Sequence, residues 1–237
     1  LVQGIPALAQ EGAGLSRAQR AAVADVESRV GLIKEVNRKI WDYAEVGLEE
    51  TRSSALLQKH LKENGFKVEA GVSGMPTAFV ASYGSGKPVI GILAEYDALP
   101  GMSQKIDPVR APLRPGRPGH ACGHSGLGSG ALGAALAIKA AMAAHKLRGT
   151  IRLYGTPAEE TVIGKVYMLL DGQFAEVLVE VAVPRDLVPG GGDPLGDLGV
   201  TFGVPGGDEE RRGDAALFEE IEQAVDADLR SVAAIAE

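Results

Sequence analysis

The residues most capable of chemistry lie in two short segments of the chain. Cys122 and His124 stand two positions apart, and Glu159 and Glu160 are adjacent carboxylates further along. Thiolate, imidazole and carboxylate are the three ligand types of protein zinc sites, and a further glutamate can act as a base on water. These residue types therefore predict a hydrolytic metal site in which Cys122 and His124 are candidate ligands, while one of Glu159 and Glu160 binds the metal and the other acts as base.

Two more residues are candidates for the same site. Asp97 follows the apolar run 89–94, and α/β enzymes place site residues at the carboxyl ends of such strands. It could orient a ligand histidine, or simply form a turn before Pro100. His120 could be a metal ligand, a substrate contact, a support for a ligand, or an ordinary loop histidine.

Each feature also has a plainer interpretation. A cysteine beside a histidine is commonly a packing feature, and Glu159–Glu160 could be the acidic start of a helix near Val162. A third interpretation makes Cys122 a nucleophile with His124 or His120 as its base, but two residues is a short separation for such a pair. The glycine-rich turn that holds Cys122 and His124 favours a functional site.

Apolar periodicity and turn residues predict the elements around these residues. Helical spacing covers 16–44, 51–64, 126–145 and 162–170, and Gly65 stands where a helix commonly ends. Short β-branched runs at 66–72, 77–83, 89–94, 150–155 and 177–183 predict strands, and the run 89–94 is apolar on both faces. Residues 100–118 read as a loop. Alternating helices and strands predict an α/β fold, a layered and mostly parallel sheet flanked by helices.

Composition narrows the classes of function. The chain has 237 residues, 45% apolar, and a net charge of −7, which disfavours nucleic acid or an anionic membrane as a partner. No apolar run reads as long enough to span a bilayer. One cysteine excludes an internal disulfide. Residues 1–9 are either a signal-peptide remnant or a polar leader, so the expected location is cytoplasmic, with periplasmic or secreted as the alternative.

The character of the sequence changes after Phe174. Residues 184–207 are rich in glycine, proline and aspartate and predict a linker, while 208–237 predict an acidic amphipathic helix. We therefore expect a catalytic domain over 1–183, followed by these two segments.

The segments 40–47, 91–104, 118–126 and 149–160 together resemble the zinc-dependent amidohydrolases of the aminoacylase/carboxypeptidase group. Within that group they are most similar to the branch of p-aminobenzoyl-glutamate and amino-acid-conjugate hydrolases. The resemblance covers roughly residues 32–174. It implies that Cys122, His124 and Glu160 bind zinc or manganese, as one or two ions. It also implies that Glu159 is the general base, that Asp97 supports the site, and that the substrate is an N-acyl amino acid.

The sequence also departs from that family. Ser125 stands where this branch carries an acidic or amide residue, and no histidine follows His145. The family is dimeric through an inserted second domain, for which we expect no counterpart here, so the pattern reads as truncated or altered after Phe174. The alternative to an active hydrolase is therefore an inert homologue that acts as a partner subunit or is non-functional.

Overall fold

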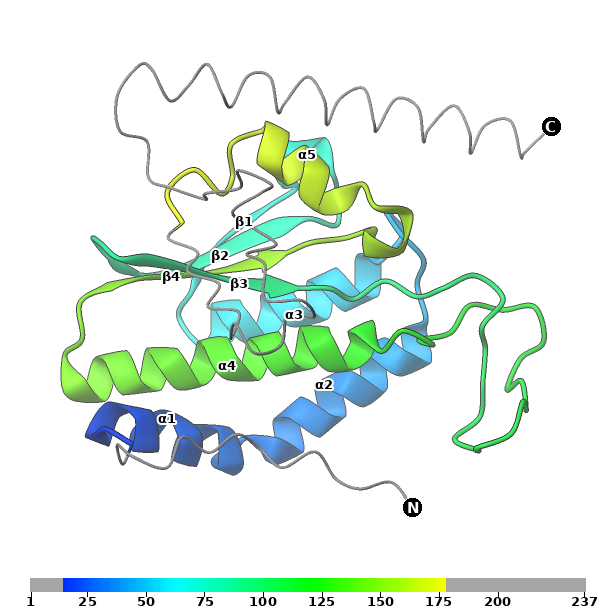
Figure 1. Ribbon diagram of the computed structural model, residues 1–237, viewed down its shortest axis with the longest axis horizontal. Coiled ribbons are helices and arrows are strands. Elements are labelled where there is room, and N and C mark those ends of the chain that lie inside the picture. The colour runs from blue at the N-terminus through cyan, green and yellow to red at the C-terminus, as the bar shows by residue number, and fades with distance from the viewer. Residues whose placement is uncertain (1–14, 178–237) are drawn as a thin grey trace, which may run out of the picture.

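The computed structural model describes residues 15–177. The described part is an α/β arrangement in which helices lie on both faces of a four-stranded sheet (Figure 1). The predicted α/β class with flanking helices is therefore confirmed. The predicted linker over 184–207, the acidic helix over 208–237 and nearly all of the predicted strand 177–183 lie outside the described residues.

The chain begins with three helices, α1 (Arg17–Ser28), α2 (Val30–Tyr43) and α3 (Thr51–Glu63). Ser16 and Gln19 form a capping box that starts α1. The single helix expected over 16–44 is wrong, because Arg29 leaves helical geometry with φ −100° and ψ 5°. Apolar spacing continues across this break, so periodicity alone could not reveal it.

The sheet contains β1 (Lys67–Ala70), β2 (Phe79–Ser85), β3 (Val89–Ala94) and β4 (Gly149–Gly155), in the order β1-β2-β4-β3. A single turn of 3-10 helix, η1 (Val72–Gly74), joins β1 to β2. β1 pairs antiparallel with β2, β2 pairs antiparallel with β4, and β3 pairs parallel with β4. The expectation of a mostly parallel sheet is thus wrong for the described strands, because β1 and β2 form a hairpin rather than a crossover.

The long helix α4 (His124–His145) connects β3 to β4 and makes their pairing parallel. α4 packs on the sheet through β3 and β4, with α1, α2 and α3 also against it. Beyond β4 follow a 3-10 turn, η2 (Glu159–Thr161), and helix α5 (Gly164–Leu170). Figure 1 shows α5 on the opposite face of the sheet from α4.

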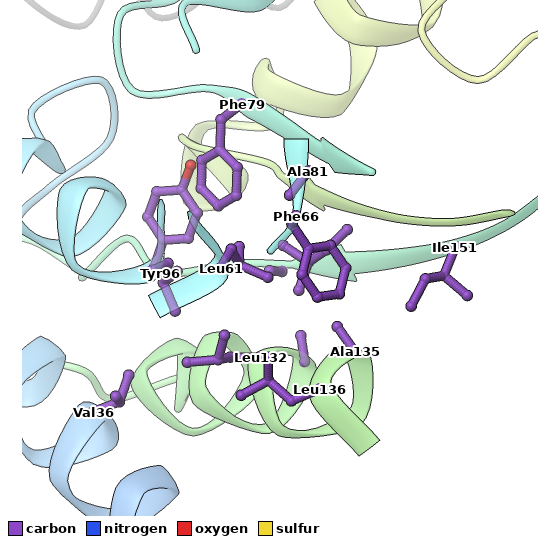
Figure 2. Close-up of a cluster of buried hydrophobic side chains, with 14 of the residues drawn as sticks. Val36, Leu61, Phe66, Phe79, Ala81, Tyr96, Leu132, Ala135, Leu136 and Ile151 are labelled. Carbon is purple, nitrogen blue, oxygen red and sulfur yellow. The ribbon is translucent and has the colours of Figure 1, made fainter. Parts of the chain in front are cut away.

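Side-chain alternation along the strands divides the core into two parts. Phe79, Ala81 and Leu153 face α2, α3 and α4, where Figure 2 shows Leu61, Leu132 and Leu136 packed against the sheet. Val80 and Tyr154 point to the other face, where they pack with Met168 of α5. This period of two is what a sheet covered on both faces requires.

Two features of the fold differ from expectation. By length and composition alone, α4 is the one described helix apolar enough to cross a membrane, contrary to the expectation that no apolar run is long enough. Half of its apolar window is buried, and its packing against the sheet accounts for its composition. The sequence predicts that β3 is covered on both faces, but Ile90 and Leu93 are 46% and 48% exposed at the described edge of the sheet.

Candidate metal centre

The candidate residues converge where β3 and β4 end. These strands run parallel with Ala94 opposite Gly155, so the segments that follow them leave the same edge of the sheet. Glu95 and Asp97 follow β3, and Glu159 and Glu160 follow β4. Thr156 links the ends of the two strands, because its N–H and its hydroxyl both donate to the carbonyl of Ala94.

The first residue of α4 brings the imidazole into this corner. His124 is 2% exposed, and Gly123 before it has a φ of 102°, a backbone conformation that favours glycine. Gly128, one turn further along α4, lies against the segment that follows β3. A Cβ at this position would lie 2.7 Å from the carbonyl oxygen of Glu95. A glycine here lets α4 approach the segment that carries the acidic side chains.

Asp97 holds both His124 and the backbone of Glu160. Its Oδ1 lies 2.8 Å from Nδ1 of His124, and its Oδ2 accepts a hydrogen bond of 2.8 Å from the Glu160 N–H. Burial alone would raise the pKa of Asp97, but these hydrogen bonds outweigh it and lower the pKa below its usual value. The carboxylate therefore keeps the proton of His124 on Nδ1 and leaves Nε2 for another partner.

Acidic side chains surround His124. Nε2 lies 3.2 Å from Glu95 Oε2 and 3.4 Å from Glu159 Oε2, while Nδ1 lies 3.6 Å from Glu160 Oε1. The hydrogen bond to Asp97, and then the charges of the neighbouring carboxylates, raise the pKa of His124. Lys165 of α5 pairs with Glu95 at 2.5 Å and lies 3.9 Å from Glu159. Four carboxylates thus face one imidazole and one ammonium.

Two overlapping groups in the described part of the chain could hold a metal ion. Cys122, His124 and Glu160 place their ligand atoms within 4.8 Å of one another, and so do Glu95, His124 and Glu159. Among residues 15–177, Glu160 Oε1 is buried without a hydrogen-bond partner. An unpartnered buried carboxylate oxygen beside a sulfur and an imidazole, in a corner with excess negative charge, fits a divalent cation.

The plainer interpretations fit this geometry less well. Glu159 and Glu160 lie in the single 3-10 turn η2, and Val162 and Ile163 separate that turn from α5, so they are not the acidic first turn of α5. Cys122 is exposed rather than packed in the core. Local desolvation and then the charge of Glu160 raise the pKa of its thiol, which disfavours the thiolate that a cysteine nucleophile needs.

His120 lies at the edge of the centre rather than in either ligand group. Its Nε2 lies 3.0 Å from the carbonyl oxygen of Ile40, and within residues 15–177 its Nδ1 is buried without a partner. Burial lowers the pKa of His120, which favours the neutral ring. Since Nε2 then donates to Ile40, Nδ1 carries a lone pair that can accept a hydrogen bond or bind an ion.

Three residues of this region were not predicted from the sequence. Glu95 stands two positions before Asp97, so the period of an extended segment could have indicated it. Lys165 carried no such signal. Glu50 is fully buried, and its carboxylate accepts hydrogen bonds from the Ala158 N–H at 2.8 Å and the Thr77 hydroxyl at 2.9 Å. Glu50 thereby holds the backbone immediately before Glu159.

This fold and constellation are those of a metallopeptidase-like hydrolase, and comparison with known proteins defines the family. The chain belongs to Peptidase family M20/M25/M40, whose model matches residues 91–230. The resemblance predicted from the sequence motifs is therefore confirmed at the level of the family.

Individual relatives agree with this assignment. The chain is 44% identical over 140 residues to a p-aminobenzoyl-glutamate hydrolase subunit of Escherichia coli, a match that covers 59% of this chain and 29% of the relative. It is 34% identical over 145 residues to N-acetyl-L-cysteine deacetylase of Bacillus subtilis, covering 58% and 32%. The chain thus spans about a third of the length of these relatives.

A solved structure supports the fold. A dinuclear metal-binding peptidase of the M20 family from Bacillus subtilis superposes with a TM-score of 0.53 at 26% identity. The match covers 65% of this chain and 41% of that one.

Proposed function

We propose that this chain takes part in metal-dependent hydrolysis of an amide bond in an N-acyl amino acid or a p-aminobenzoyl-glutamate-like substrate. One observation carries the proposal: the sulfur of Cys122, the imidazole of His124 and a carboxylate oxygen of Glu160 lie within 4.8 Å of one another. Membership of the M20 family and the names of the relatives, which include a p-aminobenzoyl-glutamate hydrolase and an N-acetylcysteine deacetylase, support it.

Cys122, His124 and Glu160 would hold a zinc or manganese ion. When bound, such an ion polarises a substrate carbonyl and lowers the pKa of water. His124 belongs to both candidate groups, and its bond to Asp97 leaves it one free nitrogen. Since the two groups share that nitrogen, we propose one ion held through His124.

Glu159 is suited to move the proton. Its side chain is 37% exposed, so water can reach it, and its Oε2 lies 3.4 Å from His124 Nε2. We assign it the role of taking a proton from the attacking water and delivering it to the amine of the leaving amino acid. A C–O bond forms and the C–N bond breaks, while Asp97 and Glu50 hold the backbone on either side of Glu159.

Replacement of Glu159 by glutamine tests this role. The amide keeps the size of the side chain but cannot carry the proton, so we expect turnover of N-acyl amino acids to fall about 10²–10⁴-fold. Glu159→Gln should still bind zinc, because Cys122, His124 and Glu160 are unchanged. Glu63→Gln, an exposed carboxylate on α3, is the matched control. Unchanged turnover in Glu159→Gln would remove Glu159 from the mechanism.

The Escherichia coli relative is named as one subunit of its p-aminobenzoyl-glutamate hydrolase, which supports a partner subunit for this chain. We propose that the chain contributes its centre to an assembly. Light scattering of the purified chain, alone and with a candidate partner, would test this. If the chain binds metal yet hydrolyses no N-acyl amino acid even within such an assembly, the inert-homologue alternative replaces the hydrolase.

A further inference from the structure

A cationic cavity lies beside the candidate metal centre. The segment 100–118 projects past the carboxyl-terminal end of α2 (Figure 1) and encloses with it a cavity of about 560 Å³. Two aromatic side chains at the end of α2 and four basic side chains of the segment line it: Trp41, Tyr43, Lys105, Arg110, Arg114 and Arg117.

The charge of this cavity is opposite to that of the chain. The chain carries a net charge of −7, yet the described residues that line the cavity include four cationic side chains and one carboxylate, that of Asp42. Asp42 already pairs with Arg38 at 3.0 Å. Across residues 15–177, no ion pair joins any of the four cations to a carboxylate. Several unneutralised cations around one concave surface concentrate positive potential and attract an anion.

Hydrogen bonds within the segment fix the backbone that carries the four cations. The Ser103 N–H donates to the Arg117 carbonyl at 2.9 Å, and the Lys105 N–H donates to the Ala111 carbonyl at 2.8 Å. The side chain of Gln104 bridges the two limbs, because it donates to the Val109 carbonyl at 2.7 Å and accepts from the Ala111 N–H at 3.0 Å. The segment is therefore a bonded hairpin-like loop.

The wall of the cavity is continuous in sequence with the candidate metal ligands. His120 and Ala121 form part of the wall, and Cys122 is the next residue, with its Cα about 3.8 Å from that of Ala121. Among residues 15–177 the Nδ1 of His120 is without a partner, and it offers an acceptor in the wall of the cavity two residues before Cys122. A substrate with its amide at the candidate metal ligands could therefore extend a second group into the cavity.

We propose that this cationic cavity binds the side-chain carboxylate of the substrate's amino-acid part and thereby selects N-acyl amino acids whose amino-acid part is acidic. Arginine matches a carboxylate with two parallel hydrogen bonds, so Arg114 and Arg117 are the residues we assign to this contact. The inference rests on the proposed hydrolysis for the identity of the ligand, but the binding it describes does not require turnover.

A binding measurement tests the cavity separately from hydrolysis. The full chain, treated with a chelator, is titrated with p-aminobenzoyl-glutamate and with p-aminobenzoyl-glutamine, which keeps the α-carboxylate but carries an uncharged amide of the same shape in place of the side-chain carboxylate. We expect the glutamate ligand to bind at least about tenfold more tightly, the size of one charged hydrogen bond, and this preference to shrink as salt is added. The double variant Arg114→Gln/Arg117→Gln should lose the preference, while Arg148→Gln, an exposed arginine outside the cavity, should retain it.

The outcomes separate the two proposals. Equal binding of the two ligands, or a preference that survives in the double variant, would overturn the cationic cavity as a carboxylate site. If the preference is present and depends on Arg114 and Arg117, the cavity stands even when no hydrolysis is detected, and only the proposed function fails. If hydrolysis occurs with the same kcat/KM for both ligands, the hydrolase stands and the cavity proposal fails.

Discussion

Asp97→Asn is the substitution that isolates the support of the metal centre. The Asp97 side chain is fully buried, and its two oxygens accept from His124 Nδ1 and from the Glu160 N–H, each at 2.8 Å. Asparagine has nearly the same shape but one acceptor oxygen. Whichever way the amide turns, one of these two donors faces an NH₂ group that cannot accept its hydrogen.

The cost follows from those two contacts. A buried donor left without a partner costs about 1–3 kcal/mol. Loss of the carboxylate also removes the group that keeps the His124 proton on Nδ1, and loss of such supporting contacts typically weakens metal affinity about 10–100-fold. We therefore expect Asp97→Asn to bind zinc about 10–100-fold more weakly in a titration against a chromophoric chelator.

Controls distinguish a local loss of zinc affinity from a general loss of the fold. The urea unfolding midpoint of Asp97→Asn, and the zinc affinity of the exposed Glu63→Gln, show whether the effect is local. If Asp97→Asn remains folded and binds zinc as tightly as the unchanged chain, then Asp97 does not orient His124 for a metal.

Three further predictions concern buried or titrating groups. Glu50→Ala should lower the free energy of unfolding by about 1–3 kcal/mol, because it leaves the buried N–H of Ala158 without its hydrogen-bond acceptor. Urea unfolding measures this, and an unchanged midpoint would show that the contact is dispensable. Burial opposes ionisation of Glu45, but hydrogen bonds from the start of α3 outweigh it and lower its pKa. The contribution of ionised Glu45 to the free energy of unfolding should therefore be present above about pH 4.3 and vanish as the pH falls through the lowered pKa. In Glu45→Gln, the free energy of unfolding measured against pH should fall less steeply in this acid range. Because the pKa of His124 is raised, protons should compete with zinc, and affinity measured against pH should fall about tenfold per unit below that pKa; a flat profile would exclude His124 as a ligand.

The sequence predicted the corner of the fold that holds the site. The apolar run at 89–94 coincides with β3, and the run at 150–155 matches β4 apart from one residue. Since a helix separates these runs, parallel pairing follows, and the residues after both strands had to meet. The meeting of Cys122, His124, Asp97, Glu159 and Glu160 was thus predictable from motif order and strand ends.

Other parts depended on contacts that no local pattern reveals. Glu50 lies 108 residues from Ala158, its hydrogen-bond partner, so nothing near either residue indicates the pairing. The antiparallel order of β1 and β2 depends on which neighbour each strand finds, and β-branched runs are alike in both cases. The segment 100–118 read as a loop, but its internal hydrogen bonds and the cavity that it forms with α2 appear only in three dimensions.

Cobalt binding shows whether Cys122 is a ligand of the metal centre, because a cobalt–thiolate bond gives an intense charge-transfer absorption that imidazole and carboxylate ligands do not. We expect the full chain to bind Co²⁺ with this band, Cys122→Ser to lose the band, and zinc to displace the Co²⁺. Co²⁺ that binds without any thiolate band, or a chain that binds neither ion, would contradict a centre built from Cys122, His124 and Glu160.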